Sequence, residues 1–178
     1  MTYPTEPGQD SKHSVFANCG KVAGSVPILK IRDSTKPAQG PAFDIVDEAL
    51  YHFRTNIFMR DFQIKSDADR LLIYLTFYAM KCLKFFAKNA KDKNKCKTEI
   101  ESWNLKPFPI PGDDGFILAS LITNPPKPAE KAELTGYFKQ LRTEIGNRLL
   151  DIVFASGAAD KWWVCFAPRK FMGKEMTN

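Results

Sequence analysis

Two histidines and four cysteines are the side chains that could supply a nucleophile or hold a metal. A catalytic thiol needs a base that removes its proton, and Cys82 with His52 is the pair that could do this. Cys82, however, lies in the middle of an apolar run, where burial disfavours a thiolate. A buried structural cysteine is therefore the better interpretation.

A zinc site would have to combine these histidines with scattered cysteines, because the chain has no Cys-x-x-Cys pair and no spacing typical of zinc ligands. The sequence also contains no glycine-rich phosphate-binding motif and no His-Glu-x-x-His zinc motif. Gly112 to Gly115, Gly-Asp-Asp-Gly, is typical of a turn and is not followed by the ligands of a calcium loop. The sequence thus predicts no catalytic residue, no cofactor and no metal site, and the chain is not expected to be an enzyme.

The element expected to organise the chain is a helix from Ser66 to Asn89. Ser66 followed by Asp69 resembles a capping box, which fixes the start of a helix. From Leu71 to Ala87 nearly every residue is apolar or aromatic, so this helix must be surrounded by protein or lipid. Two lysines interrupt the run before it reaches the length of a membrane span. We therefore expect a buried central helix in a protein core.

Two amphipathic helices are expected to pack around the central one. Asp44 can cap a helix that runs to about Met59, and a second helix should run from about Ala129 to Phe154. Their apolar residues recur every three or four positions: Val46, Ala49, Leu50, Phe53, Ile57 and Phe58 in the first, and Leu134, Phe138, Leu141, Ile145, Leu149 and Ile152 in the second. The expected fold class is all-α, with one buried helix surrounded by others.

A single domain is expected over residues 1–178, because this length and a 44% hydrophobic composition suit one core. Residues 1–41 are rich in Gly, Pro, Ser and Thr and are interpreted as an extended surface arm that adds little to the core. Gly24 and Pro27 interrupt its one apolar patch and favour an extended conformation. The helical core then covers residues 42–172, and residues 173–178 form a tail.

Two segments between the helices could contact a partner. Lys91 to Lys97 alternates lysine with small or polar residues, which is typical of a solvated loop and short helix, with a basic contact patch as the alternative. Residues 107–111 alternate proline with Phe108 and Ile110 and should form a stiff, proline-rich loop that displays two apolar side chains. Spacing alone fits packing on the chain's own core and on a partner surface equally well.

The formal net charge is +6 and the pI is about 9.1, so acidic partners such as nucleic acid, anionic lipid or an acidic protein surface are favoured. A free-standing basic nucleic-acid-binding domain is the alternative class of function. It is disfavoured because most aromatic residues fall on core-facing stripes and not between basic residues on an exposed face. The dispersed cysteines indicate reduced thiols in the cytosol.

Five stretches resemble one protein family, and they occur in its order and at about its spacing from residue 44 to residue 172. They are Asp44 to Leu50 (DIVDEAL), Phe62 to Tyr74 (FQIKSDADRLLIY), Pro107 to Phe116 (PFPIPGDDGF), Gln140 to Glu144 (QLRTE) and Lys161 to Met172 (KWWVCFAPRKFM). Together they are similar to subunit 3 of the actin-related protein 2/3 complex. The resemblance implies an all-α, non-catalytic structural subunit of the assembly that nucleates a daughter actin filament on the side of a mother filament.

The resemblance also implies partners and a location. The partners would be the other subunits of that complex, chiefly the larger actin-related subunit, and the actin filament, in the branched actin networks of the cytoplasm. No cofactor is expected, because nucleotide binding in that family belongs to the actin-related subunits. No nucleic acid and no membrane span are expected either, because the aromatic residues fall on core-facing stripes and lysines interrupt the apolar run. The candidate interface residues are Phe108, Ile110, Trp162, Trp163, Arg169, Lys170 and Lys174. Adjacent helical residues point about 100° apart, so the two tryptophans should be divided between core and interface.

Overall fold

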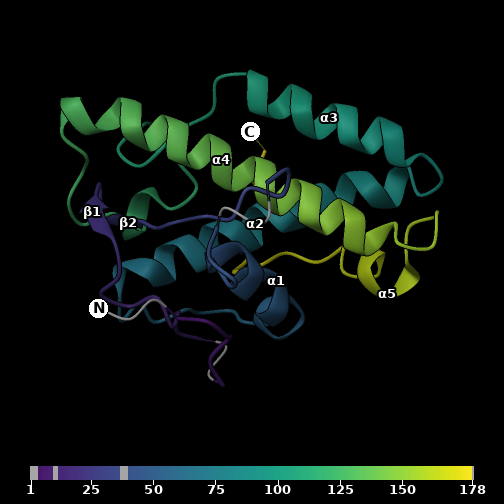
Figure 1. Ribbon diagram of the computed structural model, residues 1–178, viewed down its shortest axis with the longest axis horizontal. Helices are drawn as coiled ribbons and strands as arrows, with labels where there is room; N and C mark the ends of the chain where they lie inside the picture. Colours follow the sequence, from purple (N-terminus) through teal and green to yellow (C-terminus); the bar gives the residue numbers. More distant parts are fainter. Residues whose placement is uncertain (1–3, 10–11, 37–39, 178) are drawn as a thin grey trace.

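The computed structural model describes residues 4–9, 12–36 and 40–177, so the two ends of the chain, residues 1–3 of the expected arm and residue 178 of the expected tail, lie outside the described residues. In chain order the elements are β1 (Lys21–Ala23), β2 (Val26–Ile28), α1 (Ile45–Asn56), α2 (Asp67–Lys88), α3 (Lys93–Leu105), the 3-10 helix η2 (Ala119–Leu121), α4 (Pro128–Val153) and α5 (Lys161–Val164) (Figure 1). The described part of the chain is thus mostly helical, with a small two-stranded sheet.

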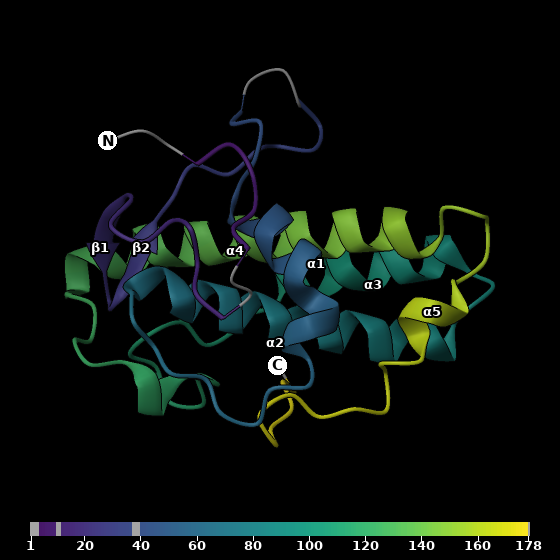
Figure 2. The same ribbon diagram turned by 90° about the horizontal axis from the view of Figure 1, so that it is seen from below.

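Helix α2 is in contact with α1, α3, α4 and α5. Figure 2 shows it below α4, with α1 in front of it. Of its 22 residues, 16 are buried, and consecutive residues such as Leu71, Leu72 and Ile73 are all fully buried, so every face of the helix is covered. The carboxylate of Asp69 accepts a hydrogen bond from the amide of the N-cap residue Ser66 at 3.2 Å. The predicted buried helix that starts at Ser66 is confirmed.

Helix α4 packs along α2 and α3 through its apolar stripe. The expected core residues Leu134, Phe138, Leu141, Ile145 and Leu149 are fully buried. Ile152, in contrast, is 42% exposed, so its assignment to the core was wrong. Val153, four residues after Leu149, takes the core position, and the preceding residue points about 100° away from it.

The lysine-rich segment begins α3, and this helix approaches α4 closely at Gly146. A methyl group at Gly146 would come within 2.8 Å of the side chain of Ile100, which is 1% exposed. The absence of a side chain therefore lets the two helices meet. Lys95 and Lys97 are exposed in the first turns of α3, and Lys91 is exposed just before it, as expected for a solvated segment. A contact of these lysines with a partner remains an untested alternative.

The arm differs most from the expectation. It forms an antiparallel β-hairpin in which Val22 lies opposite Pro27. Four of its residues enter the core with no more than 4% exposure, namely Phe16, Ala23, Val26 and Leu29. The prediction that the arm adds little to the core was therefore wrong. The mostly helical architecture agrees with the expected all-α class, to which the arm adds a small two-stranded sheet.

The hairpin depends on a tight turn at Gly24 and Ser25. Both residues have positive φ angles, +55° and +64°, which is the geometry of the two-residue turns that join twisted antiparallel strands. Pro27 is tolerated because both strands of a two-stranded sheet are edge strands. The same Gly and Pro that favoured an irregular arm in the sequence thus form part of regular structure.

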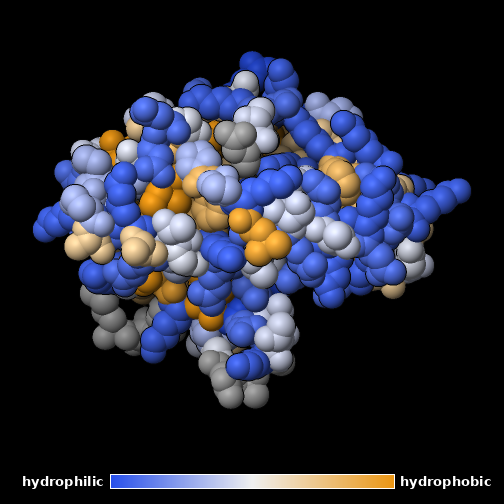
Figure 3. All heavy atoms as spheres, turned by 90° about the horizontal axis from the view of Figure 1, so that it is seen from above, coloured by the Kyte–Doolittle hydropathy of each residue, from blue (hydrophilic) through white to orange (hydrophobic). Residues whose placement is uncertain are grey.

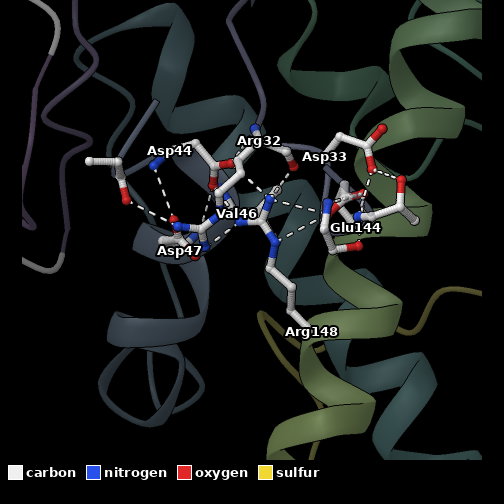
Figure 4. A network of polar contacts seen from close by, with 10 residues as sticks. Arg32, Asp33, Asp44, Val46, Asp47, Glu144 and Arg148 are labelled. Carbon is white, nitrogen blue, oxygen red and sulfur yellow. Dashed lines mark hydrogen bonds and ion pairs between the residues drawn. The ribbon is translucent and has the colours of Figure 1, made fainter. Parts of the chain in front are cut away.

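A cluster of charged groups around Arg148 joins the arm to α1 and α4 (Figure 4). The guanidinium group donates to the two carboxylate oxygens of Asp44 at 2.7 and 2.9 Å, and to Asp47 at 2.9 Å. It also donates to Glu144 at 3.2 Å and to the backbone carbonyl of Arg32 in the arm. Three segments that are distant in the sequence are therefore held at one point.

Asp44 has two roles in this cluster. Its carboxylate caps α1 by accepting from the amides of Val46 and Asp47, both at 3.0 Å, while it also binds Arg148. Burial alone would raise the pKa of Asp44, but the hydrogen bond and charge of Arg148 hold it below its usual value. Burial and the nearby charge of Asp44 raise the pKa of Asp47. Asp44 is thus the ionised counter-charge that Arg148 requires.

A second anchor holds the arm through Ser14. Its amide donates to Asp69 of α2 at 2.8 Å, and its hydroxyl donates to Glu48 of α1 at 2.6 Å. The amide of Val15 also donates to Glu48, at 2.8 Å. Burial raises the pKa of Glu48, although these hydrogen bonds oppose the change. The arm is therefore bound to both helices by specific polar contacts as well as by apolar packing.

Candidate protein-interaction surface

The C-terminal segment that carries most of the predicted interface residues begins with the single-turn helix α5. Asp160 caps this helix by accepting from the amide of Trp162 at 2.9 Å. Trp163 is 9% exposed, whereas Trp162 is 64% exposed. The two tryptophans therefore face different ways, as expected from helix geometry. A contact between Trp162 and a partner remains a prediction.

Two aromatic rings of this segment pack against the C-terminal end of α1. Trp163 stacks on Phe53 with ring centroids 5.7 Å apart, and Phe166 meets Phe58 edge to face at 6.1 Å. Phe53 is fully buried, while Phe58 is 57% exposed. A layer of aromatic rings therefore continues from the core to the molecular surface.

Two exposed arginines cover this layer. The guanidinium carbon of Arg54 lies 4.8 Å from the ring centroid of Trp163, and that of Arg169 lies 4.5 Å from the centroid of Phe58. We call Arg54, Phe58, Trp163, Phe166 and Arg169 the aromatic–arginine surface. Aromatic residues and arginine are enriched at the centres of protein interfaces, so this combination suits a protein partner.

Sequence reasoning placed Arg169 and Trp163 here but missed Arg54 and assigned Phe58 to a core stripe. Helix α1 ends at Asn56, so Phe58 follows the last helical turn and does not obey its periodicity. Ile57 takes the core position, with 2% exposure. The sequence signal for an exposed Phe58 was its position directly after Ile57, because only one of two adjacent large apolar residues beyond a helix can readily face the core.

Lys170 and Lys174 are exposed on either side of a buried anchor. Phe171 between them is 1% exposed and packs on Phe77 of α2 with ring centroids 4.9 Å apart. The anchor fixes this segment against α2, and the two lysines remain at the surface. Their contact with a partner remains a prediction.

The proline-rich loop is folded onto the chain's own core. Ile110 is 3% exposed, and its amide donates to the carboxylate of Asp113 at 3.1 Å, which closes a turn. Ile110 thus presents almost no surface to a partner, and its place among the interface candidates is corrected. Phe108 is half-buried, and its ring lies over the guanidinium group of Arg142.

The described residues contain no group of three or more metal-binding side chains. Cys82 is fully buried, and burial raises the pKa of its thiol to about 12, so it carries no thiolate at neutral pH. The prediction that Cys82 is buried is confirmed. Among the helices that the structure describes, none is long and apolar enough to cross a lipid bilayer. The face of the molecule in Figure 3 is mostly hydrophilic, with separate small hydrophobic patches.

Comparison with known proteins supports the resemblance that the five sequence stretches carry. Residues 9–176 match the family described as "P21-Arc: ARP2/3 complex ARPC3 (21 kDa) subunit". The chain is 40% identical over 166 residues to the "Actin-related protein 2/3 complex subunit 3" of Dictyostelium discoideum, which covers 88% of this chain and 92% of that protein.

Two further relatives agree. The "Probable actin-related protein 2/3 complex subunit 3" of Caenorhabditis elegans is 43% identical over 140 residues, 76% of this chain and 75% of that protein. The subunit 3 of Saccharomyces cerevisiae is 31% identical over 178 residues, 96% of this chain and 99% of that protein. Because these matches extend over almost the whole described fold, this chain belongs to the family of subunit 3 of the actin-related protein 2/3 complex.

Proposed function

We propose that this chain is a non-catalytic structural subunit of the actin-related protein 2/3 complex and supports nucleation of branched actin filaments on the side of a mother filament. The observation that carries the proposal is membership of the family over residues 9–176. Its location would be the cytoplasmic actin cytoskeleton. The protonated, buried thiol of Cys82 fits a role without catalysis.

The aromatic–arginine surface is the part of the molecule that we assign to the larger actin-related subunit. Phe58 is 57% exposed and is already held in place by Phe166 and Arg169, so a partner can bury it with little loss of side-chain freedom. Arg54 and Arg169 carry positive charge at its rim, which suits an acidic protein surface. The exposed Lys170 and Lys174 lie in the same segment and are candidates for contact with actin.

Affinity purification tests the function and the surface together. The tagged chain replaces the endogenous subunit in cells, and the proteins that co-purify are identified and quantified. We expect the actin-related subunits to be recovered with the unchanged chain. Arg54→Glu combined with Phe58→Ser should lower their recovery by about tenfold or more, because truncation of a central interface residue costs roughly 2 kcal/mol or more.

Val22→Ser is the matched control, because Val22 is 50% exposed on β1, at the opposite end of the molecule from α5 (Figure 1). Its recovery of partners should equal that of the unchanged chain. If the unchanged chain is purified as an isolated monomer without any actin-related protein, the proposed function is wrong. If the double variant recovers every partner in full, only the assignment of the surface is wrong.

The nucleic-acid alternative rests on the net charge of +6 alone and is not favoured. It predicts binding to DNA or RNA that weakens steeply as salt rises, because each neutralised phosphate releases counterions. Two exposed rings lie beside cations, Phe58 beside Arg169 and Trp162 beside Lys161, but most of the other aromatic rings pack in the core, which leaves few open faces for base stacking. A titration at two salt concentrations distinguishes the two functions.

A further inference from the structure

Arg142 on α4 is a buried positive charge without a counter-ion among the described residues. It is 1% exposed, and its guanidinium carbon lies 4.1 Å from the ring centroid of Phe108 and 4.7 Å from that of Tyr78. Its Nε and Nη1 atoms have no hydrogen-bond partner in the part of the chain that the structure describes. None of the ion pairs found there includes it. A buried charge with two nitrogens that lack hydrogen bonds is costly, because cation–π contacts offset only part of the lost hydration.

A cavity of about 360 Å³ opens beside Arg142 and carries two further positive charges. Lys81 of α2 and Lys106 at the end of α3 line it together with the rings of Trp103 and Phe108. The ammonium group of Lys81 lies 4.4 Å from the centroid of Trp103. No carboxylate is among the residues that line this cavity in the described part of the chain. We call it the Arg142 pocket.

The electrostatic state of Lys81 agrees with an excess of positive charge. Burial and the neighbouring charge of Arg142 lower the pKa of Lys81 to about 8, and Lys106 acts in the same direction. Glu99 opposes the change, but it does not line the pocket. An anion that entered the pocket would reverse this balance and stabilise all three cations at once.

We propose that the Arg142 pocket binds a carboxylate group presented by an acidic segment of a partner protein. Arg142 lines the pocket, and the ammonium groups of Lys81 and Lys106 add two donors beside it. The two oxygens of a carboxylate match these two donors, and Trp103 and Phe108 can take the apolar stem of an Asp or Glu side chain. A phosphate group would turn an additional charged, strongly hydrated oxygen toward the rings, which is unfavourable.

This inference rests on the proposed function, since it identifies the chemistry of one contact within a protein assembly. Zero-length cross-linking with a water-soluble carbodiimide tests it on the assembled complex, because the reagent joins a lysine amine only to a carboxylate in direct contact. We expect peptides in which Lys81 or Lys106 is linked to an Asp or Glu of another subunit. Cross-links from both lysines to this chain alone, or no cross-link from either, overturn the proposal.

Variants at the rim give a second, quantitative readout. Lys106→Glu should weaken incorporation of the chain into the complex about tenfold, because one attraction becomes a repulsion. Lys106→Arg should retain incorporation. Lys97→Glu is the matched control, since Lys97 is an exposed lysine of the same helix and does not line the pocket. Normal incorporation of Lys106→Glu overturns the proposal even if all subunits co-purify.

The phosphate alternative has its own outcome. A phosphoserine peptide or inorganic phosphate that protects Lys81 and Lys106 from amine-reactive labels, in the absence of any carboxylate cross-link, would assign the pocket to phosphate and overturn the carboxylate proposal. Failure of the proposed function looks different from either result, because then no actin-related subunit is recovered with the unchanged chain at all.

Discussion

Arg148 and Arg142 lie on the same helix, and both place a guanidinium group in the interior of the protein. Arg148 has a side chain that is 9% exposed and ion pairs with Asp44, Asp47 and Glu144. Arg142 is 1% exposed, yet it has aromatic rings for neighbours and two nitrogens without hydrogen bonds among the described residues. One arginine has its counter-charges within the chain, and the other does not.

The two arginines are therefore suited to different roles. A buried charge is tolerable only when it is paired and hydrogen-bonded. Arg148 meets this condition with groups from the arm and α1, so it holds the arm, α1 and α4 together in the isolated chain. We call this cluster the Arg148 joint. Arg142 does not meet it, and the missing counter-charge can be supplied by a partner. Under the proposal made above, folding and assembly would use the same chemistry at two different places.

The largest effect is expected for Arg148→Met. The variant leaves Asp44, which is fully buried, and Asp47 without their cation, and an uncompensated buried charge destabilises a protein by roughly 3 to 5 kcal/mol. Urea denaturation at neutral pH measures the change in the free energy of unfolding. A loss below about 1 kcal/mol, the range of surface ion pairs, would show that the cluster is not a joint.

Acid should weaken the joint in a specific pH window. The folded-state pKa of Asp44 is below its usual value of 3.8, so its contribution to stability is fully present above 3.8 and is lost as the pH falls below it. The pKa of Asp47 is raised, so its ionised form destabilises the folded protein. As the pH falls, Asp47 is protonated before Asp44, and this first step removes a destabilising contribution. Unfolding curves recorded between pH 6 and about 2.5 measure these two opposite changes in the free energy of unfolding.

The pH dependence also has an internal control. The pKa of Asp69 is lowered too, by the amides of Ser14, Lys65 and Ser66 and by His13, which together outweigh the effect of burial. This contribution is independent of Arg148. Arg148→Met should therefore reduce the acid-induced loss of stability without abolishing it. An acid transition that is identical in the variant would contradict the role of Arg148 in holding Asp44 ionised.

A much smaller effect on stability is expected for Arg142→Met. The change removes cation–π contacts with Phe108 and Tyr78, but it also removes a buried charge and fills similar space with an apolar chain. The free energy of unfolding of the isolated chain should shift by about 1 kcal/mol or less. A loss close to that of Arg148→Met would show instead that Arg142 stabilises the core of the isolated chain.

The smallest effect is expected for Lys106→Met in the isolated chain. Lys106 is exposed, so the free energy of unfolding should change by less than about 0.5 kcal/mol. Because Lys106 lowers the pKa of Lys81, its removal should raise that pKa above its present value of about 8. An NMR titration of the Lys81 amine measures the change. No increase would show that the pocket does not couple the two lysines.

Much of the fold follows from local patterns. The helix after Ser66, the cap at Asp44 and the long helix that ends near Val153 were predicted within about two residues, because capping residues and apolar spacing act over one or two turns. The hairpin was missed because Gly24 and Pro27 are breakers in isolation, and only the tertiary fold supplies the core that buries Val26. Local rules could not predict that contact.

The candidate surfaces were less accessible to sequence reasoning. Trp163 and Arg169 were proposed from the C-terminal segment, but Arg54 and Phe58 come from a segment more than 100 residues earlier, and their contacts exist only after folding. For Ile110 the sequence spacing fitted packing on the core and contact with a partner equally well. The turn closed by Asp113 places Ile110 in the core. Periodicity cannot decide which of two neighbouring apolar residues faces inward beyond a helix end.

Residue order and short-range spacing are enough to predict the family, the positions of the long helices and the buried character of α2. They could not distinguish Arg142 from Arg148, since both are arginines on one helix with polar neighbours in the chain. Tertiary structure decided that difference. It brought Asp44 and the carbonyl of Arg32 to one guanidinium group and the rings of Phe108 and Tyr78 to the other, and charge interactions depend on such distances in space.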